Sequence, residues 1–407
     1  MPHDRKSPSS LGDLSVGVRL FPEISGEQRL MLDSVIRLVE SNCPLPVVRR
    51  QAEQNRLGDA DLRREFADLG CFGLLVHEDH GGGSLSGNGV VDAALVASER
   101  GARLQPGPFV GTNVVAYALS EAGTTPGLEA LADLVAGKAS AVWAFDGALV
   151  GDRRSVLAVR QDGDELVLDG TVCGVQGADE CDWILVSALS SDGPVQVLVA
   201  NPTGGMTLER VDGMDITRRF SDIHFSSVRV PARQRLGGSA DAEGLLNRQL
   251  AVACVLSAAE SVGAMDANFQ LALEYSRVRI AFGRPIGSFQ AVKHLLANTS
   301  LLLEMAKAVV AGAAVKLGAG APDGPALASI AKAFVGERAV ELTHNCFQVF
   351  GGIGYTWEHD QHLFMRRLAS ESFLYGSPVA HRRSLWSHAD VSTGARTGER
   401  TGGRVDA

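Results

Sequence analysis

The sequence has few cysteines, fewer basic than acidic residues, and no apolar run approaching the roughly 20 residues of a bilayer span. Its six cysteines stand apart without a Cys-x-x-Cys pair, so neither a disulfide-rich scaffold nor a zinc site is expected. Lys and Arg number 38 against 47 Asp and Glu, and the net charge of −9 argues against a nucleic-acid-binding surface. The composition therefore predicts an ordinary globular protein, and neither a membrane nor a nucleic acid is expected among its partners.

The N-terminal segment lacks the apolar stretch of a secretory signal, because Met1–Ser10 is polar and charged. The cysteine content is also far from that of disulfide-stabilised secreted domains. We therefore expect reduced, mostly buried cysteines and a cytoplasmic location. A chain of 407 residues is long enough for about two or three domains closing around a ligand.

The periodicity of apolar residues changes twice along the chain. Ser25 and Gln28 fit a capping box that begins a helix, and the first third has helical spacing. From about Ser140, short β-prone runs alternate with Asp-Gly turns, and helical spacing returns after Pro231. We predict an α+β, mainly α, protein, divided as follows: polar lead 1–24, helical domain 25–137, middle β domain 138–236, C-terminal helical bundle 237–391 and disordered tail 392–407.

The C-terminal helices carry the two stretches most suggestive of a ligand site. A long Ala-rich helix is predicted to end near Arg279, followed by helices at 289–317, 323–348 and 359–374. The first stretch, Arg279–Gln290, reads RIAFGRPIGSFQ, and residue types alone favour helix capping by cations and surface charge over a ligand site. The second, Gln348–Tyr355, reads QVFGGIGY, and its glycines suit either a helix end or close approach to a ligand.

Together, in this order and inside a helix–β–helix chain, these stretches resemble the acyl-CoA dehydrogenase family. Further matches are Leu69–Gly82 (LGCFGLLVHEDHGG) and Phe225–Pro231 (FSSVRVP), and the resemblance covers roughly residues 25–390. It implies an N-terminal helical domain, a β-barrel-like middle and a C-terminal four-helix bundle. This agrees with the changes of period.

The resemblance implies the reaction and its partners. In the family, a carboxylate removes the α-proton of an acyl-CoA thioester while FAD accepts the β-hydride. An electron-accepting flavoprotein then reoxidises the flavin. In family oligomers two chains hold each flavin, and one chain extends residues to the FAD of its neighbour. The matching positions here are Arg279, Phe282, Phe289, Gln290, Gln348, Val349, Phe350, Gly351 and Gly352.

The sequence departs from the family where a chain holds its own flavin. Family members carry a Trp-Ile-Thr/Ser run in the β domain, preceded by a segment with Thr, Glu or Pro and Gly-Ser-Asp. The corresponding places here read Gly174-Val-Gln176 and Ala144-Phe-Asp-Gly147, without the indole and the hydroxyls. This chain is therefore expected to hold flavin poorly by itself.

The catalytic base is also missing from both family positions. One position is Gly376 and the other is Asn247, before Arg248, and neither residue has a carboxylate. Glu243, Glu358 and Glu371 are nearby substitutes, with Glu371 the leading candidate. Each is better explained as a solvated helix charge.

A subset of the family accounts for these losses. In the actinobacterial acyl-CoA dehydrogenases that shorten steroid side chains, two unlike chains share a site, and Gly351–Asp360 and Pro106–Phe109 look like that subset. The sequence is thus interpreted as the complementing subunit of a heteromer acting on a steroid or other bulky acyl-CoA. A self-sufficient homo-oligomer with a displaced base and a non-catalytic scaffold remain as alternatives.

One further pattern has the spacing of metal ligands. His359 and His362 lie on the predicted last helix, but without a third ligand they are expected to be surface residues, and no metal is assigned. Trp357 fits either an acyl pocket or the packing of the bundle.

Overall fold

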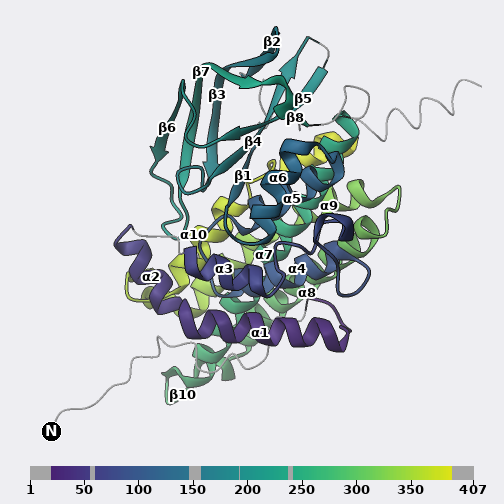
Figure 1. The fold of residues 1–407 in the computed structure, drawn as a ribbon. Coiled ribbons are helices and arrows are strands. Elements are labelled where there is room, and N and C mark those ends of the chain that lie inside the picture. The colour runs from purple at the N-terminus through teal and green to yellow at the C-terminus, as the bar shows by residue number, and fades with distance from the viewer. Residues whose placement is uncertain (1–19, 56–59, 146–156, 192, 237–241, 387–407) are drawn as a thin grey trace, which may run out of the picture.

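The computed structural model describes residues 20–55, 60–145, 157–191, 193–236 and 242–386. The predicted tail at 392–407 and most of the polar lead at 1–24 lie outside these ranges. Within them, a sheet stands at one end of the molecule and helices fill the rest, with the N-terminal and C-terminal helices packed side by side (Figure 1). The predicted order of helices, strands and helices is confirmed.

The first third of the chain is helical. Ser25 caps the first helix as predicted: its hydroxyl accepts from the Gln28 amide, and the Gln28 side chain accepts from the Ser25 amide. The second helix, α2, was not predicted, and it begins after Pro44. The helices are α1 (Gly26–Asn42), α2 (Leu45–Glu53), α3 (Ala60–Asp68), η1 (Glu78–His80), α4 (Gly89–Ala102), α5 (Phe109–Ala122) and α6 (Thr125–Val135).

The middle third forms one twisted sheet with a core of its own. Its order is β6-β7-β3-β2-β4-β5-β8, and β1 pairs in parallel with β4. The inner face is lined by valines, leucines and isoleucines. The strands are β1 (Ala141–Ala144), β2 (Ala158–Asp162), β3 (Glu165–Gln176), β4 (Trp183–Ser190), β5 (Gly193–Ala200), β6 (Met206–Val211), β7 (Phe220–Pro231) and β8 (Arg235–Leu236), with η3 (Ala232–Gln234) before the last.

The C-terminal bundle is built around α7 (Ala242–Val278), which ends one residue before the predicted end at Arg279. By length and composition α7 could cross a membrane, but 94% of its most apolar window is buried inside the protein, as in the core helix of a globule. The remaining elements are β9 (Ile280–Ala281), β10 (Arg284–Pro285), η4 (Ile286–Ser288), α8 (Gln290–Gly318), α9 (Gly324–Phe350), η5 (Gly351–Tyr355) and α10 (Gln361–Glu371).

Two glycines allow the backbones of α4 and α7 to come into direct contact where the helices cross. A Cβ on Gly101 would overlap the carbonyl oxygen of Glu260, and one on Gly263 would overlap that of Ser98. The small residues therefore fix how closely the N-terminal helices approach the bundle. This contact holds α4 and the start of α5 against the C-terminal half, where the candidate site lies.

Candidate functional site

A cavity of roughly 340 Å³ lies where α5, the sheet and the segment after α10 meet. We call it the aromatic cavity. It brings together the two places where the sequence departs from the family: Gly174–Gln176 from β3 and Gly376 beyond α10. Phe145, from the other departing segment, also lines it, whereas Asp146 and Gly147 fall outside the described residues. Its other lining residues are Pro108, Gly111, Val142, Trp143, Cys173, Gly213, Met214, Phe220, Ser370, Phe373, Leu374 and Tyr375.

Three aromatic rings form one wall of this cavity. The Trp143 ring stacks on Tyr375 at 5.9 Å between centroids and lies 4.8 Å from Phe145. Trp143 is fixed from behind, because its indole N–H donates to Ser187 Oγ at 2.8 Å. Such a wall can pack against a planar or apolar ligand.

The backbone at Tyr375 and Gly376 is unusual. Both residues have positive φ, +59° for Tyr375 and +107° for Gly376, and a side chain at the second position would be strained. The carboxyl group that the family places at this position is absent. Among the described residues lining the cavity no Asp or Glu occurs, so their side chains offer no carboxylate base.

The Gly174–Gln176 segment lies on an irregular part of β3. The pairing of β3 with β7 shifts register between Val172 and Val175, and Gly174 has φ +67°. The Gly174 amide donates to Asp222 at 2.7 Å, so the bulge is held by the neighbouring strand. The polar side chains of the lining residues are those of Cys173, Gln176, Ser370 and Tyr375. Ser370 comes from α10, and the polar lining residues from β3, Cys173 and Gln176, do not supply the Thr/Ser hydroxyl that the family presents there to its own flavin.

The sequence suggested that Glu371 is a solvated helix charge. The structure shows that this is wrong, because only 1% of the Glu371 surface is exposed. Its carboxylate pairs with Arg218 and accepts from Ser257 Oγ at 2.9 Å. The prediction failed because Arg218 comes from a distant part of the chain, before β7. Glu371 is also not a lining residue of the aromatic cavity.

Arg218 and Glu371 belong to a buried charge cluster joining the β segment to the bundle. Arg218 Nη2 lies 2.7 Å from Glu260, and Arg367 Nε lies 2.8 Å from Asp215. Burial raises the pKa of Glu371, although the Arg218 charge opposes this. Burial acts on the Glu260 pKa in the same sense, but Arg218 and Arg367 outweigh it and lower that pKa. Lys332 Nζ donates to the Glu371 carbonyl at 2.5 Å, and burial lowers its pKa.

The other base positions lie on the surface. Asn247 is exposed in the second turn of α7, and the neighbouring Arg248 hydrogen-bonds Tyr117. Glu243 and Glu358 are exposed, as predicted for solvated charges. Neither lines the aromatic cavity.

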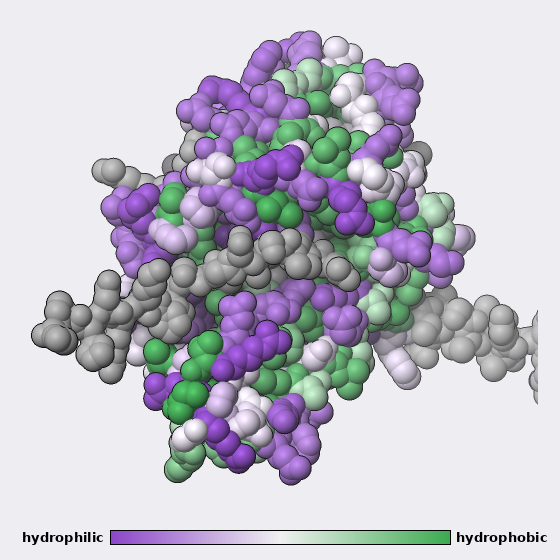
Figure 2. Space-filling model, turned by 90° about the horizontal axis from the view of Figure 1, so that it is seen from below, coloured by the Kyte–Doolittle hydropathy of each residue, from purple (hydrophilic) through white to green (hydrophobic). Residues whose placement is uncertain are grey.

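The first predicted ligand stretch forms a projecting arm, residues 279–290. Strands β9 and β10 pair through a two-residue turn, Phe282-Gly283, in which both residues have positive φ. Phe282 stands at the tip with 94% of its surface exposed, and the Arg284 guanidinium lies 4.1 Å above the Phe289 ring. The arm lies at the lower end of the molecule (Figure 1), and the face seen from below mixes hydrophobic and hydrophilic residues (Figure 2).

The second stretch lies at the same end of the bundle. Phe350 packs 5.1 Å from Tyr275, one turn before the end of α7, so residues 348–352 and the arm are brought together. Gln348, Gly351 and Gly352 are exposed and remain available to a ligand, whereas the Val349 and Phe350 side chains are 7% and 5% exposed and pack inward. The geometry is compatible with ligand contact through exposed side chains and backbone, with Arg279 and Gln290 exposed on the arm.

The structure places the two histidines differently from the sequence-based expectation. His359 precedes α10 instead of lying on it, and both His359 and His362 are buried, at 8% and 6% exposure. The His359 ring lies tilted against Phe350, and the His362 ring stacks on Trp357. Burial lowers the pKa of both imidazoles. The described residues contain no group of three or more potential metal ligands.

Trp357 does not line the aromatic cavity, and its ring stacks on His362 of α10. It is 48% exposed, and its indole N–H donates to Glu53 on α2 at 2.9 Å. It therefore ties the segment before α10 to the N-terminal helices. The prediction that the cysteines are mostly buried is confirmed: five of the six are buried, and Cys173 is the exposed one.

The cluster residues Asp215, Arg218, Glu260 and Arg367 and the cavity wall at Trp143 were not predicted. Their signal was weak but present. Glu260 sits within an otherwise apolar stretch of α7, and a buried carboxylate needs a cationic partner. Periodicity cannot identify that partner.

Known proteins match this chain along most of its length. A family model described as the acyl-CoA dehydrogenase N-terminal domain matches residues 25–129, and one described as its C-terminal domain matches 244–386. The acyl-CoA dehydrogenase IpdE2 of Mycolicibacterium smegmatis is 31% identical over 363 residues, covering 89% of this chain and 98% of that protein.

Two solved structures share the whole fold. One, described as a variant of the Tcur3481-Tcur3483 steroid ACAD, is 26% identical with a TM-score of 0.81, covering 91% of this chain and 99% of the other. The other, the ChsE4-ChsE5 complex from Mycobacterium tuberculosis, is 24% identical with a TM-score of 0.78, covering 93% of this chain and 99% of the other. The second likeness concerns the fold alone.

Proposed function

Because this chain belongs to the acyl-CoA dehydrogenase family, we propose that it acts as one subunit of a heteromeric acyl-CoA dehydrogenase. The family comprises FAD-dependent oxidoreductases acting on acyl-CoA. In the proposal, a second acyl-CoA dehydrogenase-like chain supplies the base and the main grip on FAD. This chain completes the site.

The observation that carries the proposal is the composition of the aromatic cavity. No carboxylate occurs among its described lining residues, and Gly376 stands where the family has its base. The cavity also lacks the flavin-directed hydroxyl, whereas the arm is exposed and retains its Arg and Phe side chains. A complementing subunit is expected to keep the arm that reaches the partner's FAD and to lack a complete flavin site of its own. The arm and the aromatic cavity of this chain fit that expectation.

The roles of this chain's residues follow from the two surfaces. FAD, when bound, supplies the hydride acceptor for α,β-dehydrogenation. Arg279 has the planar guanidinium suited to pyrophosphate oxygens, and Phe282, Phe289 and Gln290 stand beside it on the arm. We assign them, with Gln348–Gly352, to holding the FAD of the partner subunit.

The proposed substrate is a bulky acyl-CoA, with a steroid thioester as the leading case. A 26% identical solved structure is a steroid ACAD, and this supports the assignment. An electron-accepting flavoprotein is proposed to reoxidise the enzyme, and the cytoplasm is proposed as its location. The acyl group itself depends on pocket shape in the assembled enzyme.

Visible absorption tests the proposal directly. The chain is purified once alone and once after co-expression with the neighbouring dehydrogenase-like chain. Flavin absorbance in the co-expressed sample only is the expected result. Flavin retained by the lone chain would contradict the shared site and favour a self-sufficient homo-oligomer.

The homo-oligomer alternative needs a displaced base, and Glu371 was its leading candidate. The ion pair of Glu371 with Arg218 and its hydrogen bond to Ser257 direct that carboxylate into the charge cluster. We expect Glu371→Gln to leave acyl-CoA turnover of the co-expressed enzyme within about threefold, because this carboxylate is directed into the charge cluster. Removing a general base would instead reduce turnover about 10²–10⁴-fold. A loss of that size in protein that remains folded by circular dichroism would restore Glu371 as the base.

A non-catalytic scaffold is the remaining alternative. A scaffold would not need the exposed arm, whose Arg and Phe side chains match the positions that contact FAD in the family. It predicts no turnover with any co-expressed chain, which the same purified samples would reveal.

A further inference from the structure

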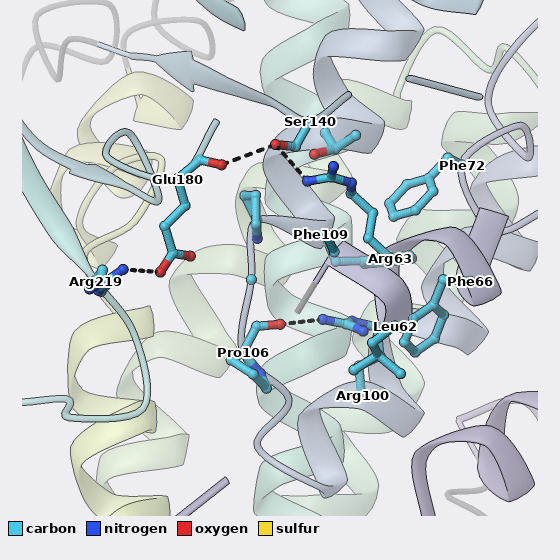
Figure 3. Close-up of a pocket in the computed structure, with 14 residues that line it drawn as sticks. Leu62, Arg63, Phe66, Phe72, Arg100, Pro106, Phe109, Ser140, Glu180 and Arg219 are labelled. Atoms are coloured by element: carbon cyan, nitrogen blue, oxygen red, sulfur yellow. Dashed lines mark hydrogen bonds and ion pairs between the residues drawn. The ribbon is translucent and has the colours of Figure 1, made fainter. Parts of the chain in front are cut away.

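A second cavity, separate from the aromatic cavity, lies between α3, the turn before α5 and the edge of the sheet (Figure 3). Its volume is roughly 250 Å³, and its walls carry the apolar side chains of Leu62, Phe66, Phe72 and Phe109. We call it the Arg100 pocket, after the cation in its wall. The volume is below the range of about 300–1,000 Å³ of sites for drug-sized ligands, so it suits a smaller molecule.

Arg100 is a buried cation without a carboxylate partner. It projects from α4 with 4% of its surface exposed, and its guanidinium carbon lies 4.6 Å from the Phe66 ring centroid and 4.8 Å from that of Phe109. One nitrogen donates to the Pro106 carbonyl at 2.6 Å, but Nε has no hydrogen-bond partner. In the described ranges no Asp or Glu oxygen lies within ion-pairing distance of it.

This state is costly for an arginine. The guanidinium carries five N–H donors, and a buried charge without a partner is strongly unfavourable. Burial lowers the pKa of Arg100 to about 10, while the more distant Glu260 opposes the shift. The Glu260 carboxylate is already engaged by Arg218 at 2.7 Å. An anion inside the pocket would therefore relieve an existing cost.

The other two arginines that line the pocket have more polar partners than Arg100. Arg63 has no ion pair among the described residues, but its Nε donates to the Gly137 carbonyl at 3.0 Å and its Nη1 to Ser140 Oγ at 3.2 Å. Arg219 pairs with Glu180 (Figure 3). Arg100, with one hydrogen bond to a carbonyl and two aromatic rings beside it, is the least compensated cation of the pocket. The Pro106–Pro108 turn separates it from the aromatic cavity, and Pro108 lines both.

We propose that the Arg100 pocket binds a small organic carboxylate with an aromatic or alicyclic body. The planar guanidinium matches a carboxylate in shape and charge, and the phenyl rings supply apolar contact for the body of the ligand. Inorganic phosphate fits less well, because the rings offer it no hydrogen bonds. The site goes beyond the proposed function and does not depend on it.

Ligand-observed ¹⁹F NMR on the full chain tests this site with a matched pair of probes. 4-Fluorobenzoate carries the carboxylate, and 4-fluorobenzamide has the same body without the charge. Saturable broadening of the benzoate signal, with at least tenfold weaker binding of the benzamide, is expected. Equal binding of the two probes, or no saturable broadening of the benzoate, would overturn the proposal.

Two variants locate the binding. Arg100→Leu removes the cation and is expected to weaken benzoate binding at least tenfold. Leu62→Trp fills the cavity while leaving Arg100 intact, and it is expected to weaken benzoate binding by the same factor. If Arg100→Leu does not fold, Leu62→Trp alone tests the location of the site. Leu30→Trp, on the exposed face of α1 at 66% exposure, is the control. Benzoate affinity unchanged in Leu62→Trp would place the binding elsewhere and refute the site.

Discussion

Glu371 and Asp215 are both buried carboxylates of the charge cluster, yet their pKa values are shifted in opposite directions. Burial raises the pKa of Glu371, and its single close cation does not reverse this. Burial acts on Asp215 in the same way, but Arg367 at 2.8 Å and the nearby Arg218 outweigh it, and its pKa is lowered. The nearby Glu260 charge also raises the pKa of Glu371, whereas hydrogen bonds from Thr217 help to lower the pKa of Asp215.

The lowered pKa of Asp215 makes part of the stability depend on pH. The ordinary Asp pKa is 3.8, and the folded value is lower. Between the two values the unfolded chain binds a proton that the native chain does not, so the free energy of unfolding falls as the pH falls. Asp215→Asn should lower that free energy by about 3 kcal/mol at pH 7. Between pH 5 and pH 3, the free energy of unfolding of Asp215→Asn should also fall by less than that of the parent protein.

Urea unfolding at pH 7, 5 and 3 measures both effects. Asp212→Asn, an exposed neighbour, serves as the control and should match the parent. An unchanged acid dependence in Asp215→Asn would show that the pairing with Arg367 contributes nothing to it.

Gly376 is expected to be intolerant of any side chain. Its φ of +107° is accessible to glycine but strained for other residues, so Gly376→Ala and Gly376→Glu should each cost about 1–3 kcal/mol. Thermal unfolding of both variants measures this. Gly204→Ala, where an added Cβ meets open space at ordinary φ, should leave the melting temperature within a degree or two, on the order of a surface substitution. Equal melting temperatures for all three would contradict the strain.

At the scale of elements, the crossing of α4 and α7 is the most sensitive contact to test. A methyl group on Gly263 would overlap the Ser98 carbonyl, so Gly263→Ala should destabilise the protein by about 1–3 kcal/mol through overpacking. Gly312→Ala on α8 is the matched control: nothing lies within 4 Å of its added Cβ, and helix propensity predicts a gain of about 0.5–1 kcal/mol. Denaturant unfolding should separate the two in sign. A stabilised Gly263→Ala would mean that the helices can separate freely.

Sequence predicted helices well where one apolar stripe was long. Helices α8 and α9 begin and end within a few residues of their predicted bounds, and the long Ala-rich helix ends one residue before its predicted end. The last helix was predicted at 359–374 but spans Gln361–Glu371, because Thr356 and His359 form a turn before it. That difference moved His359 off the helix. Helix periodicity gives no information on such local turns.

The candidate site was predictable only in part. The ligand role of the stretch at 279–290 and the empty position at Gly376 came from the resemblance to the family, and the structure places Gly376 in a cavity. The pairing of Glu371 with Arg218 depends on tertiary contact between distant segments, which spacing does not encode. The assignment of Arg279 through Gly352 to flavin binding stays a prediction, as do the domain boundaries at 137/138 and 236/237.

At the scale of the whole molecule, the proposed role of the arm is to contact the partner subunit, and this can be tested. Phe282→Ser should leave the melting temperature of the lone chain unchanged, because 94% of the side chain is exposed. In the co-expressed enzyme it should reduce flavin content at least severalfold, on the order expected for loss of an aromatic interface anchor. Flavin absorbance per protein and gel filtration measure the outcome.

Val211→Ser on β6 is the control for this variant, since Val211 is 37% exposed and β6 belongs to the sheet, which lies at the other end of the molecule from β10 (Figure 1). Flavin content should be unaffected by it. A drop in the melting temperature of the lone Phe282→Ser chain would mean that the arm stabilises its own subunit instead.

The left-handed backbone at Tyr375 and Gly376 also bears on how the lineage could change. Once a glycine occupies a position at φ +107°, neighbouring side chains can settle around a geometry that a carboxylate-bearing residue tolerates badly. Losing the acid takes one substitution, whereas regaining it takes the substitution together with a rearrangement of the turn. This asymmetry makes the change hard to reverse, and it favours descendants that keep the glycine.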